Sequence, residues 1–583
     1  MIQDHRLTER LPAAWVWSLL SALRRLPAPI WQTAGVAVVA VIIDAIWIAS
    51  NHASPQWDQA HYLDLTLHYL QAVLSGGPVA LARSVYQLDP GQAPLFPLLS
   101  VPFYGLADRG LEGPLLLNLA ELPVLLFSTG YIASRLGGER ARIPAVVAVA
   151  TTPLLVGLLH QQLQDFTLVV VATLEIALLL RADSFRSVRT SLAFGLVVGV
   201  GVLVKVTFPI FVVGPLAVVI LQIAAGWTDL RGGPVTPGGP EWRQVRNSAA
   251  AGAIAVALGS VWYVPQWLPT LAYVRSATTG ALAIGTGPSH PATWTNVARF
   301  TLGLVNGDLS WGLALVLIAG LALGVPALAG VVRSWRGVRR VAGTGLFVLA
   351  WVGVPFASVA LGRNQDVRLM AAAFPGIAVA IGVAVSTISP RLVRRTLVAA
   401  TVAVGVAQTV VLTWPLGLPS PIGVIAVGTP VGTAAVDLSG QPVGYESLPE
   451  TVDYGRRLII QVERACAQVV PRGSVCVVGV LESDAVVNGN TLQYFADVRG
   501  DHIVFPTVSA SPGHMAALLN TLRGTPVALY MPPPPASVVG TRVALLDTGY
   551  ADAFMTPAAF ALFRGPRRWI GVGRGLAVEL LSR

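Results

Sequence analysis

The segment from Asn51 to Leu74 carries the polar side chains that are best suited to chemistry. At about 100° per residue, a helix that starts at Asp58 would place five of them on one arc: Asp58, His61, Asp64, His68 and Gln71. The opposite arc would be apolar: Leu63, Leu67, Leu70, Val73 and Leu74. Such a helix is expected to lie flat on a membrane surface. Its polar arc holds acids and imidazoles instead of the basic residues of a surface anchor. Two interpretations are therefore open: these residues have a chemical role, or they form a face that is only solvated.

Three residues of this arc have the spacing of a metal site. His61, Asp64 and His68 stand at positions i, i+3 and i+7, which can bring two imidazoles and a carboxylate together on one helical face. A bound divalent metal ion is one interpretation. A pair of surface histidines that binds no ion is the other, and the sequence leaves the cofactor open.

The composition indicates a membrane protein that consists mainly of α-helices. Of the 583 residues, 54% are hydrophobic and 12% are charged, and the mean hydropathy is +0.66. Apolar runs of about 18 residues or more recur along the first 415 positions, and each can cross a hydrocarbon core of about 30 Å. The first run begins near Trp31 without a small-residue cleavage site, so we expect the first span to be retained.

About 11 transmembrane helices are expected. Seven lie near residues 31–49, 114–134, 143–160, 190–204, 207–224, 343–361 and 396–415, and four more end near Arg181, residue 264, Arg333 and Arg391. The net charge of +10 does not indicate a nucleic-acid partner, because the arginines gather in short loops between alternate spans. The first such group precedes the first span and places the N-terminus in the cytoplasm: Arg6, Arg10, Arg24 and Arg25.

From about residue 416 the composition becomes that of a soluble domain. Helices are expected at 448–470, 490–500 and 512–524, alternating with strands at 474–480, 502–508 and 526–532. This alternation predicts a small extracytoplasmic α/β domain. The glycines of GVGRG near the end do not lie between a strand and a helix, so they indicate no nucleotide site. Cys466 and Cys476 form a disulfide in an oxidising compartment or remain two buried thiols.

Charged residues recur where the predicted spans reach the outer surface. They are Asp58, Asp165, Lys205, Arg275, Arg363, Asp366 and Arg368. An ionisable group near a bilayer is costly unless it is used or paired, so we expect these side chains to line one cavity. Lys205 is the only lysine in the sequence, and its compact ammonium group suits a phosphate oxygen. The alternative is a lysine that reaches lipid headgroups.

Three acidic residues fall inside the predicted spans: Asp44, Glu121 and Glu175. A carboxylate in a hydrocarbon environment is unfavourable. We expect each of them to be hydrogen-bonded to a neighbouring helix or protonated, and we assign them no part in the chemistry.

Several segments resemble, in the same order, those of the GT-C membrane glycosyltransferases. They are WDQAHYL, APLFPLLSVPFYGL, QDFTLVVVATLEIALLLRAD, GVGVLVKVTFPIFVVGPL, WYVPQWLPTLAYV, NQDVRLMAAAFPGIAVAIG and VVNGNTLQYFADVRG. The similarity is greatest to bacterial relatives of the protein O-mannosyltransferases and the lipid A aminoarabinose transferase. It implies a transmembrane catalytic domain at 1–415, with a first outer loop at 50–113, and an extracytoplasmic domain at 416–583. The location implied is the bacterial cytoplasmic membrane.

The resemblance also implies an activity, the transfer of a sugar from a polyprenyl-phosphate donor to an acceptor at the outer face. It assigns Asp58 as the catalytic acid or base, Asp165 as a second acidic position and Lys205 as a contact of the donor phosphate. Gln59 departs from the family pattern, in which Glu often follows the Asp, and this argues against two adjacent carboxylates and a tightly bound metal there.

The residue types fit such a transfer independently of the resemblance. A carboxylate can take the proton of an acceptor hydroxyl, and cations can stabilise the leaving phosphate: Lys205, Arg275, Arg363 and Arg368. A single attack would invert the anomeric centre. The expected partners are the lipid-linked donor, an unknown acceptor and membrane lipids. A transporter or flippase of lipid-linked sugars and a non-catalytic envelope scaffold are the alternatives, although no internal repeat typical of transporters is visible.

Overall fold

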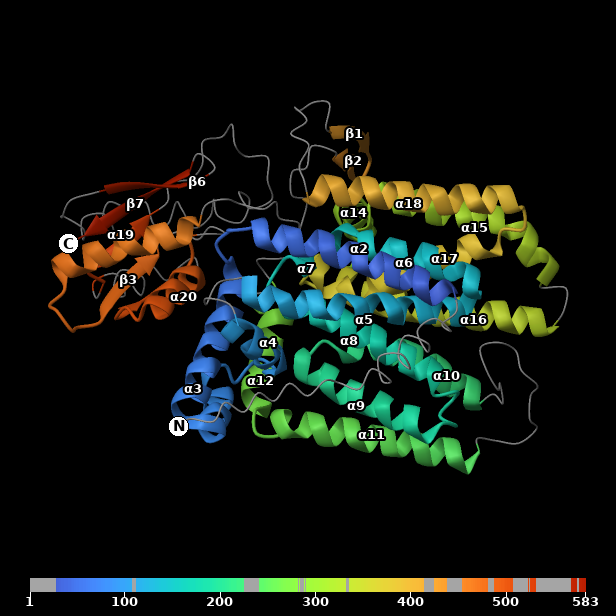
Figure 1. Ribbon diagram of the computed structural model, residues 1–583, viewed down its shortest axis with the longest axis horizontal. Helices are drawn as coiled ribbons and strands as arrows, with labels where there is room; N and C mark the ends of the chain where they lie inside the picture. The colour runs from blue at the N-terminus through green and yellow to red at the C-terminus, as the bar shows by residue number, and fades with distance from the viewer. Residues whose placement is uncertain are drawn as a thin grey trace, which may run out of the picture.

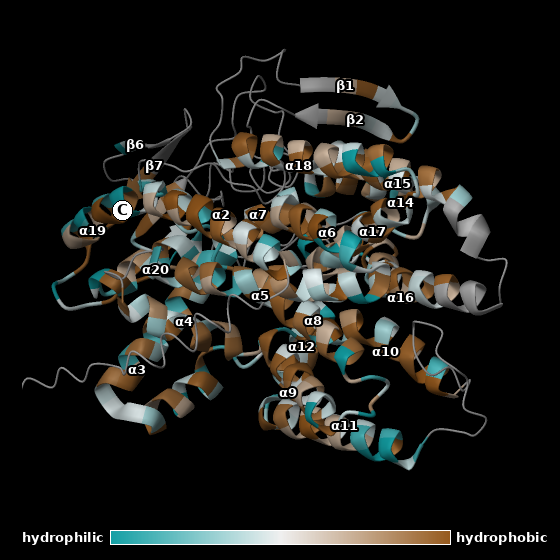
Figure 2. Cartoon of the chain, turned by 45° about the vertical axis from the view of Figure 1, so that its right-hand side comes forward, coloured by the Kyte–Doolittle hydropathy of each residue, from teal (hydrophilic) through white to brown (hydrophobic). Residues whose placement is uncertain are grey.

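Long, roughly parallel helices form a bundle, and a small sheet with two helices lies at one end of it (Figure 1). The computed structural model describes residues 28–106, 112–224, 241–280, 283, 288, 290–331, 335–413, 424–437, 453–480, 487–506, 523, 525–530, 568–573 and 576–582. Apolar residues predominate along the bundle helices, whereas the helices beside the sheet carry more polar ones (Figure 2). The mainly α fold with a small C-terminal α/β domain is therefore confirmed.

The bundle contains a helix at each of the predicted spans. In chain order they are α2 (Ala28–Ser50), α5 (Glu112–Gly137), α6 (Glu139–Thr151) with α7 (Pro153–Leu159), α8 (Gln164–Arg181), α9 (Val188–Val204), α10 (Pro209–Ala224), α11 (Trp242–Tyr263), α15 (Trp311–Val331), α16 (Trp335–Ala360), the 3-10 helix η2 (Val367–Ala373) with α17 (Phe374–Thr387), and α18 (Arg391–Thr413). The remaining helices before residue 414 are α3 (Trp57–Leu88), α4 (Leu95–Leu106), α12 (Trp267–Thr278), α14 (Trp294–Gly303) and the π-helix η1 (Leu304–Leu309).

Length and apolar character support most of these spans directly. Within the described residues, five helices are long and apolar enough to cross a membrane, or up to eight if each of three bent pairs is one span. The predicted fourth, fifth and sixth spans, α8, α9 and α10, are outside that count. Helices α9 and α10 have only 17 and 16 residues, and α8 carries three charged residues, Asp165, Glu175 and Arg181.

The third predicted span is broken, which the hydropathy pattern did not indicate. Helices α6 and α7 meet at an angle of 57°, with Thr152 in extended conformation between them and Pro153 as the first residue of α7. A proline at this position starts a helix but cannot continue one, because it lacks the N–H that an intrahelical hydrogen bond requires. The break directs the chain into the loop that precedes Asp165.

Helix α3 begins within one residue of its predicted start, but its apolar arc packs differently from the prediction. Leu63 and Leu67 are fully buried in a hydrophobic cluster with Leu458 and Phe495 of the C-terminal domain. The expected contact with a membrane surface is therefore wrong for the first turns of α3, because the C-terminal domain supplies the apolar partner. Further along, Leu74 is exposed, and Gly77 breaks the helical backbone with φ 65°.

The C-terminal domain contains most of the predicted elements. They are α19 (Tyr454–Val469), β3 (Cys476–Val480), α20 (Gly489–Arg499), β4 (Ile503–Val504) and β5 (Val527–Tyr530). The strand order is β4-β3-β5-β7-β6, with β3 parallel to β4 and β5 and with β7 antiparallel to its neighbours. The strands β6 (Arg568–Gly573) and β7 (Leu576–Ser582) were not predicted, and Gly571 and Gly573 of GVGRG lie at the end of β6.

A second hairpin, β1 (Val424–Thr429) and β2 (Gly432–Asp437), was also not predicted. The amide of Asn306 in η1 donates to the carbonyl of Thr433, and its oxygen accepts from the N–H of Ala435. The hairpin is therefore attached to the helix bundle, although its residues follow position 416. The predicted helix at 512–524 lies almost entirely outside the described residues, and so do Arg6, Arg10, Arg24, Arg25 and Arg333.

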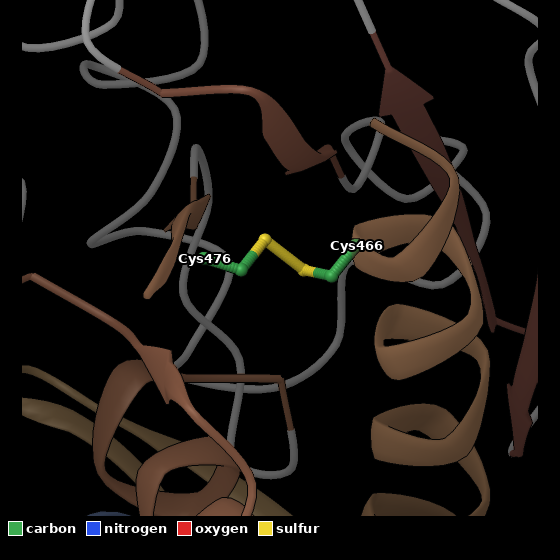
Figure 3. The surroundings of a disulfide bond; sticks show 2 residues. All are labelled: Cys466 and Cys476. Carbon is green, nitrogen blue, oxygen red and sulfur yellow. A yellow bond between two sulfur atoms is a disulfide. The ribbon is translucent and has the colours of Figure 1, made fainter. Parts of the chain in front are cut away.

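Cys466 and Cys476 form a disulfide, which decides between the two alternatives for this pair. It connects α19 to β3, with the two Cα atoms 5.9 Å apart (Figure 3). The bond closes a short loop between a helix and a central strand of the sheet. Disulfides persist in oxidising compartments, which is consistent with the predicted location of this domain outside the cytoplasm.

Replacing both cysteines with serine is expected to destabilise the C-terminal domain. With a sequence separation of 10 between the cysteines, loop-closure entropy predicts a loss of about 2–3 kcal/mol. Thermal unfolding of the purified chain, followed by limited proteolysis of the domain, measures the effect. Treatment of the wild-type chain with a reductant is the matched control and should shift the transition equally. An unchanged transition in both experiments would contradict the prediction.

Candidate active site

Asp165 and Lys205 form a buried ion pair at the ends of two bundle helices. Asp165 lies in the first turn of α8, and Lys205 directly follows α9, at the break before α10. The lysine Nζ is 2.6 Å from Oδ1 of the aspartate, and the two side chains are only 9% and 1% exposed. The sequence predicted that these residues would meet, and the structure brings them into direct contact.

The backbone around Lys205 explains the glycines that precede it. Lys205 has extended φ and ψ values of −154° and 137°, and its carbonyl accepts from the N–H of Phe208. This turn folds the Phe208 ring back onto Gly201, where an added Cβ would lie only 2.3 Å from ring atoms. Because only glycine leaves room for the ring, residue 201 allows the chain to reverse and to direct the lysine at Asp165.

Asp58 forms a second ion pair, which is accessible to solvent. Oδ2 of Asp58 is 2.7 Å from Nη1 of Arg368, and Nε of the same guanidinium is 2.9 Å from Oδ2 of Asp366. The Asp58 side chain is 46% exposed and that of Arg368 is 25% exposed. Although burial alone would raise the pKa of Asp58, the charges of Arg368, Lys205 and His61 hold this pKa below its ordinary value. Asp58 is therefore an ionised carboxylate at neutral pH.

Tyr62 lies close to both ion pairs. It is buried one turn after Asp58 on α3, and its hydroxyl donates to Oε1 of Gln92 at 2.9 Å. Burial, together with the charges of Asp58 and Asp165, raises the pKa of Tyr62 well above its ordinary value. The predicted residues Asp58, Asp165, Lys205 and Arg368 thus form one cluster around a neutral tyrosine, which the sequence reasoning missed.

A turn after α3 supplies two further partners that the sequence reasoning did not use. Asp89, Pro90, Gly91 and Gln92 form a turn in which the N–H of Gln92 is bonded to the carbonyl of Asp89. Gly91 lies against Tyr273 of α12, and an added Cβ would be 3.3 Å from the Cβ of that tyrosine. The signal was the sequence DPGQ, which is typical of a turn and carries an acid and an amide close to the predicted site.

His61, on α3, pairs with a carboxylate of this turn and not with the other residues of the predicted metal site. Its Nε2 is 2.9 Å from Oδ2 of Asp89. Although burial alone would lower it, the carboxylate of Asp89 and the charges of Asp58 and Asp64 raise the pKa of His61 above 6.5. The predicted set of His61, Asp64 and His68 is therefore wrong in its first member, because the imidazole of His61 turns toward the carboxylate after α3.

Asp64 and His68 gain a third partner from the C-terminal domain. Ligand atoms of Asp64, His68 and Asp497 lie within 4.8 Å of one another. Burial and the neighbouring carboxylate of Asp497 raise the pKa of Asp64 to about 8. The sequence could not indicate Asp497, which lies more than 400 residues away on α20.

The loop before Asp165 is fixed by polar contacts on three sides. His160 stacks on Trp47 with ring centroids 3.8 Å apart, and its Nε2 is 3.0 Å from Oδ1 of Asp44. Asn118 donates to the carbonyls of residues 159 and 161. Gln162 donates its side-chain amide to Ser100 and its backbone N–H to Gln59. These contacts hold the start of α8, and therefore Asp165, relative to α3.

Gln59 has a structural role that a carboxylate would fill less well. It is buried, and its Oε1 accepts from the backbone N–H of Gln162 at 3.2 Å. A glutamate here would place a second buried negative charge directly beside Asp58. The neutral amide is therefore consistent with a single carboxylate at this position.

Two of the three acids in the predicted spans are hydrogen-bonded, which is the first of the two alternatives expected for them. Asp44 bonds to His160, and Glu121 accepts from the hydroxyl of Thr167 at 2.8 Å. Both carboxyl oxygens of Glu175 are buried without a hydrogen-bond partner among the described residues.

Arg275 and Arg363 do not join the ion pairs of the cluster. Both side chains are exposed, and neither has an ion pair within the described ranges. The amide of Asn364 donates to the carbonyl of Ala277, which connects the end of α12 to the segment before η2. The predicted role of these arginines in phosphate binding therefore stays a prediction.

The helix bundle, the polar cluster at one end and the C-terminal domain correspond to the GT-C fold of membrane glycosyltransferases. Among solved structures, the chain is similar to ArnT from Cupriavidus metallidurans bound to undecaprenyl phosphate, with a TM-score of 0.56, 13% identity, and coverage of 95% of this chain and 98% of that chain. The apo form of ArnT gives a TM-score of 0.54 at 13% identity and covers 98% of both chains.

The arabinofuranosyltransferase AftD from Mycobacteria is also similar, with a TM-score of 0.51 and 14% identity over 95% of this chain and 40% of that chain. No protein-family model and no curated protein sequence matches the chain. The likeness at these identities establishes the fold, which the resemblance of the sequence segments had predicted.

Breaking the buried ion pair is expected to destabilise the bundle. Lys205→Met and Asp165→Asn each remove a partner, and Lys205→Met leaves a buried charge uncompensated, so losses of about 3–5 kcal/mol are expected. The double variant should be less destabilised than the sum of the single variants. Thermal unfolding in detergent provides the comparison.

The exposed pair between Arg186 and Glu241, with N and O atoms 3.2 Å apart, supplies the control. Arg186→Met should change the stability by less than about 1 kcal/mol. Equal losses of stability in Lys205→Met and Arg186→Met would contradict the prediction that the buried pair contributes more to stability than the exposed one.

Proposed function

We propose that this protein is a glycosyltransferase that moves a sugar from a polyprenyl-phosphate donor to an acceptor at the outer face of the cytoplasmic membrane. The observation that carries the proposal is the cluster of Asp58, Arg368, Asp165 and Lys205 around Tyr62. It combines one accessible, ionised carboxylate with two cations. A transfer from a phosphate leaving group requires both features.

The similarity to ArnT, whose structure contains undecaprenyl phosphate, supports a lipid phosphate as the donor carrier. The cluster lies at the end of the bundle where α3, α4, α12 and the C-terminal domain gather (Figure 1). A polyprenyl chain would lie along the apolar helices while its phosphate reached this end. Arg368 is the cation best placed for that phosphate, because it is partly exposed and adjacent to Asp58.

Asp58 acts as the general base in this mechanism. The acceptor hydroxyl attacks C1 of the sugar, its proton passes to the carboxylate of Asp58, and the bond between C1 and the phosphate oxygen breaks. The prenyl phosphate leaves with the electron pair, and Arg368 stabilises its charge. Because one displacement completes the transfer, the anomeric centre is inverted and no carboxylate forms a bond to the sugar.

Binding of the donor would also activate the base. In the described structure the guanidinium of Arg368 contacts Asp58, and this contact keeps the pKa of the carboxylate low. A donor phosphate that competes for the same guanidinium weakens its hold on Asp58. The carboxylate then becomes more basic at the moment when the acceptor must lose its proton.

Asp165 and Lys205 have a different part in this mechanism. Since the Asp165 side chain is 1% exposed and paired with Lys205, it positions the lysine and does not take the acceptor proton itself. Lys205 adds positive charge close to Asp58 and to the phosphate position. Arg275 and Arg363, exposed on neighbouring segments, are available to bind further oxygens of the donor.

The proposed orientation places the N-terminus in the cytoplasm and the C-terminal domain outside a bacterial cytoplasmic membrane. The excess of arginine in alternate loops supports it. So does the disulfide between Cys466 and Cys476, which is typical of oxidising compartments. The donor would then be made inside the cell and turned outward before the reaction.

Asp58→Asn is expected to lower the transfer rate by about 10²–10⁴-fold, because the amide cannot accept the proton. Purified protein in detergent is given polyprenyl-phosphate sugars and an extract of envelope acceptors, and the released prenyl phosphate is measured. Asp183→Asn is the control, since this exposed carboxyl lies beyond the other end of α8. Transfer that Asp58→Asn leaves intact would overturn the mechanism, and movement of the lipid without its release would favour a flippase.

The pH dependence of transfer should depend on Arg368. As the folded pKa of Asp58 is depressed, the base stays ionised as the pH falls, and the rate declines only below the ordinary carboxylate range. Arg368→Gln removes the main charge that lowers this pKa, so the acid limb of kcat/KM is expected to move to higher pH. Arg391→Gln, a change at an exposed arginine at the start of α18, should leave the acid limb in place. An unshifted limb in Arg368→Gln would exclude Asp58 as the titrating base.

A further inference from the structure

Three potential metal ligands meet where the C-terminal domain packs on α3. Asp64 and His68 stand one helical turn apart on α3, and Asp497 lies near the end of α20. One ligand atom of each residue lies within 4.8 Å of those of the other two. The two helices lie side by side (Figure 1), with buried Leu63, Leu67 and Phe495 between them. The ligands therefore come from a packed, ordered junction.

Among the described residues, the imidazole of His68 is the one potential cation that pairs with either carboxyl group, with Nδ1 3.5 Å from Oδ2 of Asp64. One carboxylate oxygen of Asp64 and one of Asp497 lie within 4.8 Å of each other. Two negative charges at this separation repel each other unless a cation lies close to both. Oδ1 of Asp64 is buried and has no hydrogen-bond partner among the described residues. An ion pair of either carboxyl with lysine or arginine is also absent from that part of the chain. A bound cation would supply what both groups lack.

Hydrogen bonds with a backbone carbonyl and with a neighbouring amide orient the imidazole and one carboxylate of the cluster. Nδ1 of His68 is 2.9 Å from the backbone carbonyl of Asp64, one turn earlier. The side-chain amide of Gln493 donates to Oδ1 of Asp497 at 3.0 Å, and Gln493 is itself held by the N–H of Phe505. Partners of this kind fix the orientation of metal-ligating imidazoles and carboxylates in known sites.

We propose that Asp64, His68 and Asp497 bind one divalent metal ion, of which zinc is the best match. Two carboxylates and one imidazole are ligands that zinc accepts, and three protein ligands leave one position for water. The ion would join the C-terminal domain to the helix that begins beside Asp58. This site is separate from the proposed reacting groups, and its function is to fix the domain on α3.

Zinc binding by the full-length chain tests this assignment. The purified protein is stripped with a chelator and titrated with zinc chloride by calorimetry in detergent. One equivalent is expected to bind and to raise the unfolding temperature. His68→Ala and Asp497→Asn should each weaken binding by at least about tenfold. His502→Ala is the control, because this exposed histidine lies in the same domain outside the cluster.

Cobalt substitution distinguishes loss of a ligand from loss of the fold. Visible absorption bands of bound Co²⁺ should appear in the wild type and in Asp497→Glu, which retains a carboxylate, but not in Asp497→Asn. Because this readout is independent of sugar transfer, it can succeed or fail whatever the outcome of the transfer assay. Failure of the wild-type chain to bind either ion, or equal binding by wild type and His68→Ala, would overturn the proposal.

Discussion

A buried lysine and a buried aspartate must lie in contact, and this requirement determines how the helices are arranged at the end of the bundle beside the C-terminal domain. Removing either charge from water is unfavourable by several kcal/mol, and only a close partner with good geometry compensates for it. The contact of 2.6 Å between Lys205 and Asp165 meets that condition. It joins the break between α9 and α10 to the first turn of α8, so three bundle helices are fixed relative to one another.

The other polar contacts at this end bring the accessible residues to that fixed point. Amide side chains and the imidazole of His160 hold the segment 160–163 against α2, α3 and α5. Because Gln59 belongs to this set and neighbours Asp58, the buried framework and the exposed carboxylate share one turn of α3. Arg368, on η2, contacts this carboxylate. The position of the accessible ion pair between Asp58 and Arg368 thus depends on the buried contacts that hold α3 and α8 together.

Much of this arrangement could be predicted from the sequence, because a few strong signals carried it. Apolar runs located the bundle helices, and isolated charges at their ends located Asp58, Asp165, Lys205 and Arg368. What could not be predicted depends on contacts across large separations in sequence. Asp497 meets Asp64 only because α20 packs on α3, and His61 leaves the expected metal set because a turn 28 residues later presents Asp89. Helical periodicity shows which residues share one face of a single helix, but it cannot predict which residues of other elements will contact that face.

Helix α3 has two sides that serve different parts of the molecule. Its first turn presents Asp58 to Arg368, while Leu63 and Leu67 bury themselves against the C-terminal domain. Any displacement of that domain would therefore act on the helix that carries the exposed carboxylate. The hydroxyl groups of Tyr104 and Tyr494 lie 3.2 Å apart, and Ser54 bonds to both Asp453 and the N–H of Gly455, so the same junction is fixed on either side of α3. The C-terminal domain is accordingly part of the structure that positions Asp58, and not an independent appendage.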